Sequence, residues 1–314
     1  MALGACLPNV TALISEITPR RRRAGMLTVT ACGASIGGAS AGFLIPALIG
    51  LGGWQVPFLV SGLFTLALVV LLFVALPESP KYYAARRAEH PDYATLARRL
   101  GLGDPALFAT PEAATEKAPL LAPLARRYRF ATAVFCGLYT VNALALYMLS
   151  SWLPTLLPQA GFSLAQAARM AGLVQAGGLV GGILISLFLD RGKAMAGLMG
   201  AYAIVLVMLI GFSLVAPDIW TWGAMLLIVG SGIAGAHLAL MAVGTSFYPA
   251  PVLSAAIGVA VAVARLGAVA GPMLGGELIK AGASAQTFFL VMALPVLVCG
   301  IGVVLIPVVQ RRRA

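Results

Sequence analysis

The stretch Val259–Glu277 reads VAVAVARLGAVAGPMLGGE, an apolar and glycine-rich run with a single arginine, Arg265, in its middle. A run of this length and composition is typical of a helix that crosses a bilayer. A guanidinium in such a helix faces lipid only at a cost on the order of several kcal/mol. We therefore expect Arg265 to face a bundle interior, a carboxylate or a water-filled path, and the stretch predicts a helical membrane protein.

The composition of the whole chain agrees with this prediction. Of the 314 residues, 61% are hydrophobic and 10% are charged, whereas soluble domains are roughly one quarter charged. We predict an all-α membrane protein with nine spans, of which the fourth ends near Trp152–Pro154. The spans are Ala2–Ile17, Met26–Leu51, Val56–Leu76, Phe130–Leu153, Leu164–Leu189, Ala194–Val215, Trp220–Ser246, Val252–Ile279 and Thr287–Val309.

The basic residues predict the orientation of these spans. The net charge of +11 does not indicate a nucleic-acid partner, because 18 of the 21 Lys and Arg fall on one side if the spans alternate. By the positive-inside rule that side is cytoplasmic. We expect an integral protein of a bacterial-type inner (plasma) membrane, with its C-terminus in the cytoplasm and its N-terminus outside.

A polar segment divides the spans unequally. Residues 84–129 are charged and contain several prolines, which predicts a cytoplasmic loop between two groups of helices. Three spans precede the loop, within residues 1–83, and six follow it, within residues 130–314. The expected domain organisation is therefore three helices, a central loop and a six-helix half.

The chain shows no sign of enzymatic or metal chemistry. Its four cysteines, Cys6, Cys32, Cys136 and Cys299, are scattered among four spans and are expected to pack as small apolar residues. No HExxH motif, Walker A loop, nucleophile elbow or intramembrane carboxylate pair is present. We expect no enzyme activity, metal site or cofactor.

Several stretches resemble the major facilitator superfamily of transporters and, within it, the aromatic acid:H+ symporters. PESP at Pro77–Pro80 is weak alone, because sugar porters end the same helix similarly, but YMLSSWLPTLL at Tyr147–Leu157 together with RLGAVAGPMLGG at Arg265–Gly276 is more specific. The other matching stretches are Met1–Arg23, Leu189–Lys193 and Phe247–Pro249. The resemblance implies a bundle of two six-helix halves, in which Ala2–Ile17 corresponds to the fourth helix and helices one to three are missing from this chain.

The same resemblance implies proton-coupled uptake of an aromatic carboxylic acid by a monomer in the lipid bilayer, with the proton as coupling ion. Arg265 would neutralise the substrate carboxylate, and five other residues would line the cavity: Tyr139, Asn142, Tyr147, Ser150 and His237. From the residues alone, Tyr139 and Asn142 share one helix face, as do Tyr147 and Ser150. Such faces could bind a substrate or could pack between helices, and His237 could be a binding residue or a hydrogen-bonded structural histidine.

The resemblance also departs from the family pattern in the substrate-binding helices. His237 and Met241 stand where a glutamine and an asparagine are expected, and Leu253 replaces a second arginine. The polarity of the pocket is therefore expected to differ from that of the family.

Charged residues near the cytoplasmic helix ends are candidates for gating. Glu16 and Arg20 lie beside the first basic cluster and would form either a gate or an anchor for topology. Asp190 and Arg191, in the sequence LDRGK, resemble the charged loop between helices eight and nine of the superfamily, one residue short, or form only a topogenic turn.

The expected function is secondary active transport. One alternative is another major facilitator carrier, for an organic anion or a sugar-type solute. A second is a transport-incompetent membrane fragment, which the absence of an intramembrane Asp or Glu favours, and an intramembrane enzyme is the least supported reading.

Overall fold

The computed structural model describes residues 10, 13–14, 23–75, 119 and 121–311. Most of the first predicted span, the gating candidates Glu16 and Arg20, and residues 76–118 of the loop region lie outside these described residues. The chain divides into two compact units, Met1–Ala34 with Leu48–Thr115 and Ser35–Ala47 with Glu116–Ala314.

The described part of the first unit contains the ends of helix α2 (Arg23–Gly52) and helix α3 (Gln55–Ala75). The two helices are joined at Gly53, whose φ of +80° suits a residue without a Cβ. The Gly53 N–H donates to the Ile49 carbonyl at 2.8 Å, and the Trp54 and Phe58 rings meet edge to face at 6.0 Å. These contacts close the tight turn that the sequence predicts between the second and third spans.

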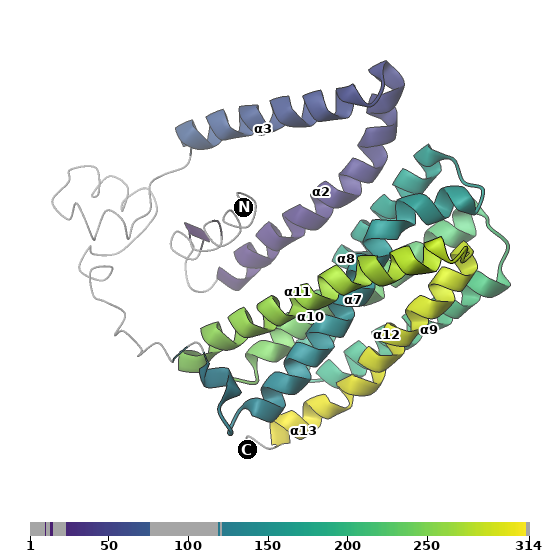
Figure 1. Cartoon of the computed structure of the whole chain (residues 1–314). Helices are drawn as coiled ribbons and strands as arrows, with labels where there is room; N and C mark the ends of the chain where they lie inside the picture. Colours follow the sequence, from purple (N-terminus) through teal and green to yellow (C-terminus); the bar gives the residue numbers. More distant parts are fainter. Residues whose placement is uncertain (1–9, 11–12, 15–22, 76–118, 120, 312–314) are drawn as a thin grey trace. The chain divides into compact units, whose positions relative to one another are not determined.

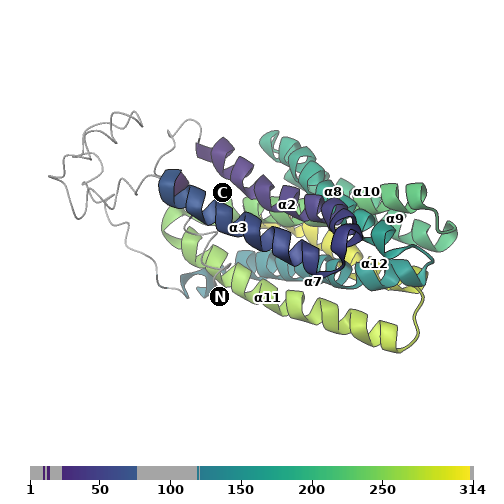
Figure 2. The same ribbon diagram turned by 90° about the horizontal axis from the view of Figure 1, so that it is seen from above.

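The second unit is a helical bundle, in which α7 to α12 lie side by side (Figures 1 and 2). A 3₁₀ turn, η1 (Ala122–Leu124), leads into it. The helices are α7 (Arg129–Gln159), α8 (Leu164–Asp190), α9 (Ala194–Leu214), α10 (Ile219–Thr245), α11 (Ala250–Lys280), α12 (Ala285–Val303) and α13 (Leu305–Arg311).

Within the described ranges, eight helices are long and apolar enough to cross a membrane. They coincide with eight of the nine predicted spans. Apolar runs of this length are helical because a helix satisfies its own backbone hydrogen bonds in lipid. Two ends differ from the prediction. Helix α7 continues through Pro154 to Gln159, and the last span breaks at Val304, where the ring of Pro307 would clash with the Val303 carbonyl in a continuous helix.

The sequence predicted that Trp152 marks the outer end of its helix, but α7 continues beyond it to Gln159. Its indole N–H donates to the Pro272 carbonyl of α11 at 2.8 Å, and the ring lies against Gly275. Because α7 extends beyond Pro154, this tryptophan instead joins α7 to α11.

Glycines bring two pairs of helices into backbone contact. On α8, a Cβ at Gly177 or Gly181 would overlap the Leu227 or Ser231 carbonyl of α10. On α11, Gly267 and Gly271 face the carbonyls of Thr140 and Leu144 on α7 in the same way. Small residues at such interfaces are the usual basis of close helix packing in membranes. The α7–α11 contact holds the arginine-bearing stretch of α11 against the tyrosines of α7.

A further glycine contact involves α2, whose middle part, Ser35–Ala47, belongs to the second unit. A Cβ on Gly42 would lie 2.6 Å from the Cα of Gly172 on α8. Gly38 and Gly42 are four residues apart, a spacing of small residues that permits such close helix contacts.

An aromatic cluster fixes α9, α10 and α12 to one another. The rings of Phe212 and Phe289 stack at 4.2 Å, and Trp222 meets both rings edge to face. All three side chains are fully buried. Asp218 caps α10 next to this cluster, accepting hydrogen bonds from the backbone N–H groups of Trp220 and Thr221.

Candidate functional site

A small polar pocket of about 60 Å³ lies between α7, α10 and α11. We call it the Arg265 pocket. Helix α7 contributes residues four apart, helix α10 contributes one histidine, and α11 contributes residues three or four apart, so that each helix presents one face. The lining residues are Tyr139, Ala143, Tyr147, His237, Val261, Ala264, Arg265 and Ala268. Alanines leave the space into which the polar side chains project, and this space suits a carboxylate group rather than a whole aromatic acid.

Four of the six predicted substrate residues therefore meet in one place: Arg265, His237, Tyr139 and Tyr147. The imidazole of His237 stacks on the Tyr139 ring, with centroids 4.2 Å apart and planes 13° apart. Tyr139 is buried, whereas Tyr147 is 39% exposed. The pocket thus combines a stacked pair, of which Tyr139 is buried and His237 half-buried, with an accessible phenol and a cation.

Arg265 has no carboxylate partner within the described parts of the chain. The one ion pair there joins Lys280 and Glu277 at 2.7 Å. The guanidinium is exposed and borders the pocket. The sequence analysis allowed Arg265 to face a bundle interior, a carboxylate or a water-filled path. An exposed guanidinium without a described carboxylate partner supports the water-filled path.

Asn142 does not line the pocket but lies behind it. Its side chain is 1% exposed and connects three helices. The Tyr202 hydroxyl of α9 donates to Asn142 Oδ1 at 2.9 Å, and Asn142 Nδ2 lies 3.2 Å from the Ile233 carbonyl and 3.1 Å from His237 Nδ1 on α10. Every polar atom of the amide is therefore engaged.

This network defines the protonation of His237. A carbonyl oxygen only accepts, so the atom of Asn142 that faces Ile233 must be the amide nitrogen, and the same nitrogen faces His237. Its second hydrogen is donated to Nδ1, which must therefore be unprotonated. Neutral imidazole then carries its proton on Nε2, so that His237 is a hydrogen-bond donor at that atom.

Ser150 lies away from the other predicted substrate residues. Its hydroxyl donates to the Leu146 carbonyl one turn earlier at 2.9 Å. The residue borders a largely apolar groove of about 400 Å³, together with Ala41 of α2 and Gln175 of α8. The structure does not bring Ser150 to the Arg265 pocket.

Asp190 and Arg191 form the exposed end of α8. Gly192, with φ of +70°, donates from its N–H to the Leu189 carbonyl at 2.9 Å, and the Lys193 N–H donates to Phe188 O at 2.8 Å. This pair of bonds is a Schellman motif. The turn is therefore explained by helix termination, which the shortened LDRGK sequence allows, and a gating role remains a proposal.

Sequence reasoning missed Tyr202. Helix α9 is apolar throughout, and this tyrosine looks like one more packing residue. The available signal was the phenol itself, because a hydroxyl in an apolar membrane helix needs a hydrogen-bond partner.

Membrane-length helices, with a polar pocket among them and an intramembrane arginine that has no carboxylate partner among the described residues, define a polytopic integral membrane protein with a polar site between its helices. The chain belongs to the Major Facilitator Superfamily, whose family model matches residues 1–264. This confirms the resemblance at the level of the superfamily and the predicted helical-bundle fold.

The chain is also similar to individual transporters. It is 34% identical to a gallate transporter of Pseudomonas putida over 94% of this chain and 66% of that protein. It is 31% identical to the 4-hydroxybenzoate transporter PcaK of Pseudomonas aeruginosa, over 94% of this chain and 67% of the relative. A 3-(3-hydroxy-phenyl)propionate transporter of Escherichia coli is 31% identical, over 96% and 68%. The chain thus spans about two thirds of the length of these relatives.

Proposed function

We propose that this chain forms part of a secondary active transporter that imports an aromatic carboxylic acid together with a proton. The observation that carries the proposal is Arg265, an intramembrane cation that borders a polar pocket and pairs with no described carboxylate. The relatives named for gallate, 4-hydroxybenzoate and 3-(3-hydroxy-phenyl)propionate support the substrate class, since all three are aromatic acids.

In this proposal the pocket binds the carboxylate end of the substrate. The Arg265 guanidinium offers paired N–H donors that match the two oxygens of a carboxylate. His237 offers Nε2–H as a further donor, because Asn142 occupies Nδ1. Asn142 and Tyr202 are then positioning residues, which hold the histidine without contacting the substrate.

The aromatic ring of the substrate would extend from the pocket past Tyr147. This side chain is the most accessible of the aromatic lining residues, and its ring can stack on or meet the edge of a benzoate ring. A pocket of about 60 Å³ encloses only the carboxylate end, so the remainder of the acid would occupy space outside it.

Proton coupling rests on the resemblance to aromatic acid:H+ symporters. Among described residues, the carboxylates Asp190, Asp218 and Glu277 are exposed at helix ends. His237 is held in one neutral tautomer, so we do not assign the coupling proton to it. Gating by Asp190 and Arg191, a monomeric state and a cytoplasmic C-terminus in an inner membrane belong to the same proposal.

Uptake of radiolabelled 4-hydroxybenzoate tests the role of Arg265. We expect the Arg265→Ala variant to reach the membrane and to lose most uptake, because a hydrogen bond to a charged group contributes about 1.5–3 kcal/mol, or roughly ten- to a hundredfold in affinity. Leu266→Ala is the matched control, since Leu266 is the adjacent residue and 69% exposed outside the pocket. Normal uptake by Arg265→Ala would refute the assignment.

Competition assays separate the substrate classes. Excess benzoate or gallate should suppress labelled uptake, whereas glucose and succinate should not. Suppression by succinate or glucose instead of benzoate would favour the organic-anion or sugar-type carrier. If the wild-type chain inserts but takes up none of these solutes, it is a transport-incompetent fragment.

A further inference from the structure

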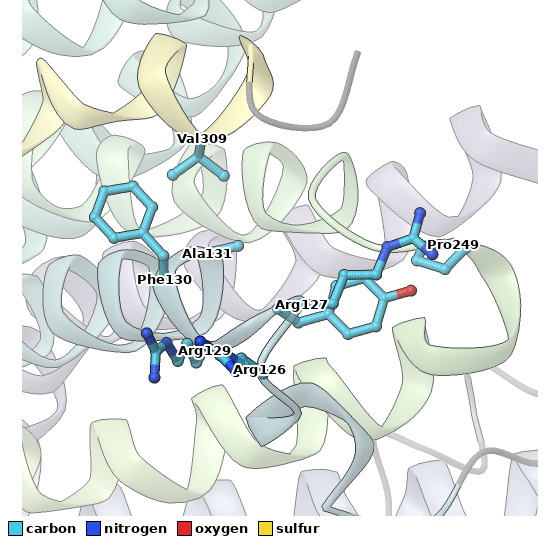
Figure 3. Close-up of a pocket in the computed structure, with 8 residues that line it drawn as sticks. Arg126, Arg127, Arg129, Phe130, Ala131, Pro249 and Val309 are labelled. Carbon is cyan, nitrogen blue, oxygen red and sulfur yellow. The ribbon is translucent and has the colours of Figure 1, made fainter.

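A second pocket, of about 760 Å³, opens where α7 begins. Three arginines within four residues, Arg126, Arg127 and Arg129, line it together with Tyr128, Phe130, Ala131, Pro249 and Val309. Figure 3 shows Arg127 extending toward Pro249, whereas Arg129 points the other way. We call this site the arginine pocket. It is separate from the Arg265 pocket, because Tyr139 lies about 15 Å further along α7.

The frame of the arginine pocket is fixed by buried hydrogen bonds. The Tyr248 hydroxyl, from the segment before α11, donates to Thr132 Oγ1 at 2.9 Å. The Thr132 hydroxyl in turn donates to the Pro123 carbonyl in η1 at 2.6 Å. The Tyr128 and Tyr248 rings lie 6.0 Å apart. The arginines therefore project from a rigid junction of η1, α7 and the start of α11.

The charged residues that line this pocket are all positive. None of the described carboxylates lines it, and the arginine side chains are exposed. The Arg127 guanidinium carbon lies 5.7 Å from the centre of the Tyr128 ring, which orients that side chain. The first turn of α7 adds the positive end of a helix dipole. Three cations border this one cavity beside a helix N-terminus, and the cavity therefore attracts an anion with several oxygens.

The position of the cavity indicates the kind of anion. It lies at the end of helices that are long and apolar enough to cross a membrane, where lipid headgroups are expected, and its wall includes the apolar residues Phe130 and Val309. Arginine binds phosphate oxygens in a bidentate manner, and basic pockets between membrane helices bind anionic headgroups. We propose that the arginine pocket binds the phosphodiester headgroup of an anionic phospholipid, with an acyl chain against Phe130.

Bound lipid would contact the transport helices at their shared end. Arg127 precedes Tyr128, the N-cap of α7, and extends toward Pro249, the N-cap of α11 (Figure 3), and both helices continue to the Arg265 pocket. A headgroup bridging these two positions stabilises the α7–α11 pair without contacting the substrate.

Native mass spectrometry of the whole purified chain tests this site, with phosphatidylglycerol, phosphatidylcholine and inorganic phosphate as separate probes. We expect phosphatidylglycerol to bind and the triple variant R126Q/R127Q/R129Q to lose about a hundredfold in affinity. The matched control R169Q/K193Q/K280Q also removes three exposed positive charges but leaves the pocket intact, and should bind within about twofold of wild type.

Three outcomes would overturn the proposal. They are unchanged phosphatidylglycerol affinity in the glutamine triple variant, equal binding of phosphatidylcholine, and complete displacement of the lipid by inorganic phosphate at equal concentration, which would assign the site to free phosphate. If the glutamine variant fails to insert, R126K/R127K/R129K retains the charges and the topology. We expect it to bind at least about threefold more weakly, because lysine lacks the planar fork of arginine, and unchanged affinity there also refutes the site.

Discussion

Replacing Asn142 with leucine removes the hydrogen-bond network behind the Arg265 pocket while keeping a side chain of similar size. Leucine cannot accept from the Tyr202 hydroxyl or donate to Ile233 O and His237 Nδ1, so three bonds of 2.9–3.2 Å are lost. At about 0.6–1 kcal/mol for each bond in a membrane helix bundle, the free energy of unfolding should fall by about 2–3 kcal/mol.

The same substitution should change the tautomer of His237. In the wild-type protein we expect ¹⁵N magnetic resonance of labelled histidine to show neutral imidazole with protonated Nε2 and bare Nδ1. In Asn142→Leu a Nδ1–H population should appear, because nothing then donates to that nitrogen. The affinity for the aromatic acid should fall by roughly three- to tenfold as the Nε2–H donor is lost from part of the population.

Thr140→Val provides the matched control, because Thr140 is two residues from Asn142 on α7 and lies on roughly the opposite face of that helix. The Thr140 hydroxyl is buried and has no hydrogen-bond partner among the described residues, and valine has nearly the same shape. We expect its stability in a detergent unfolding titration to equal or exceed that of wild type. The reasoning fails if wild-type His237 is found protonated at Nδ1, or if Asn142→Leu unfolds like the Thr140→Val control.

Two further predictions concern helix packing and pH. Gly267→Leu should separate α7 from α11, because its side chain would overlap the Thr140 carbonyl, and should lower the free energy of unfolding by about 1–3 kcal/mol. Gly258→Leu, on the same helix but with open space around the Cβ, should unfold like wild type, and equal stability of the two variants would contradict the packing. At the start of α10, hydrogen bonds from Thr221, followed by one from Trp220, hold the pKa of the Asp218 carboxyl below its ordinary value. A depressed folded-state pKa stabilises the fold above the unfolded pKa, and this contribution is lost as pH falls through the folded value. Asp218→Asn should therefore flatten the acid limb of a plot of melting temperature against pH, and an unchanged limb would exclude this cap as its cause.

The membrane helices were predictable because each apolar run must satisfy its own backbone in lipid. The convergence of Arg265, His237, Tyr139 and Tyr147 was partly predictable, since spacing along a helix shows which side chains share a face. The resemblance to transporters then indicated which helices carry the site, and the family match confirmed the class.

Spacing alone could not show which helix packs against each face. Ser150 shares a side of α7 with Tyr147, but α2 and α8 border that position rather than α11. Asn142 was predicted in contact with substrate, whereas a tyrosine from α9 and the backbone of α10 take up its amide. Both outcomes depend on tertiary neighbours that no local pattern encodes.

The glycine contacts join α7 to α11 and α8 to α10 as two stiff couples, each held backbone against backbone. The Arg265 pocket takes residues from both couples and so lies on the seam where they meet. If the α7–α11 pair slides along the α8–α10 pair, Arg265 moves relative to His237, while the contacts within each pair stay intact. The bond from Asn142 to His237 crosses the same seam at 3.1 Å, and a slip of about 2 Å at right angles to the bond would lengthen it to about 3.7 Å, beyond hydrogen-bonding distance. In the proposed transporter, Asn142 would therefore keep the Nε2–H of His237 directed at the substrate carboxylate only while the two couples remain in register.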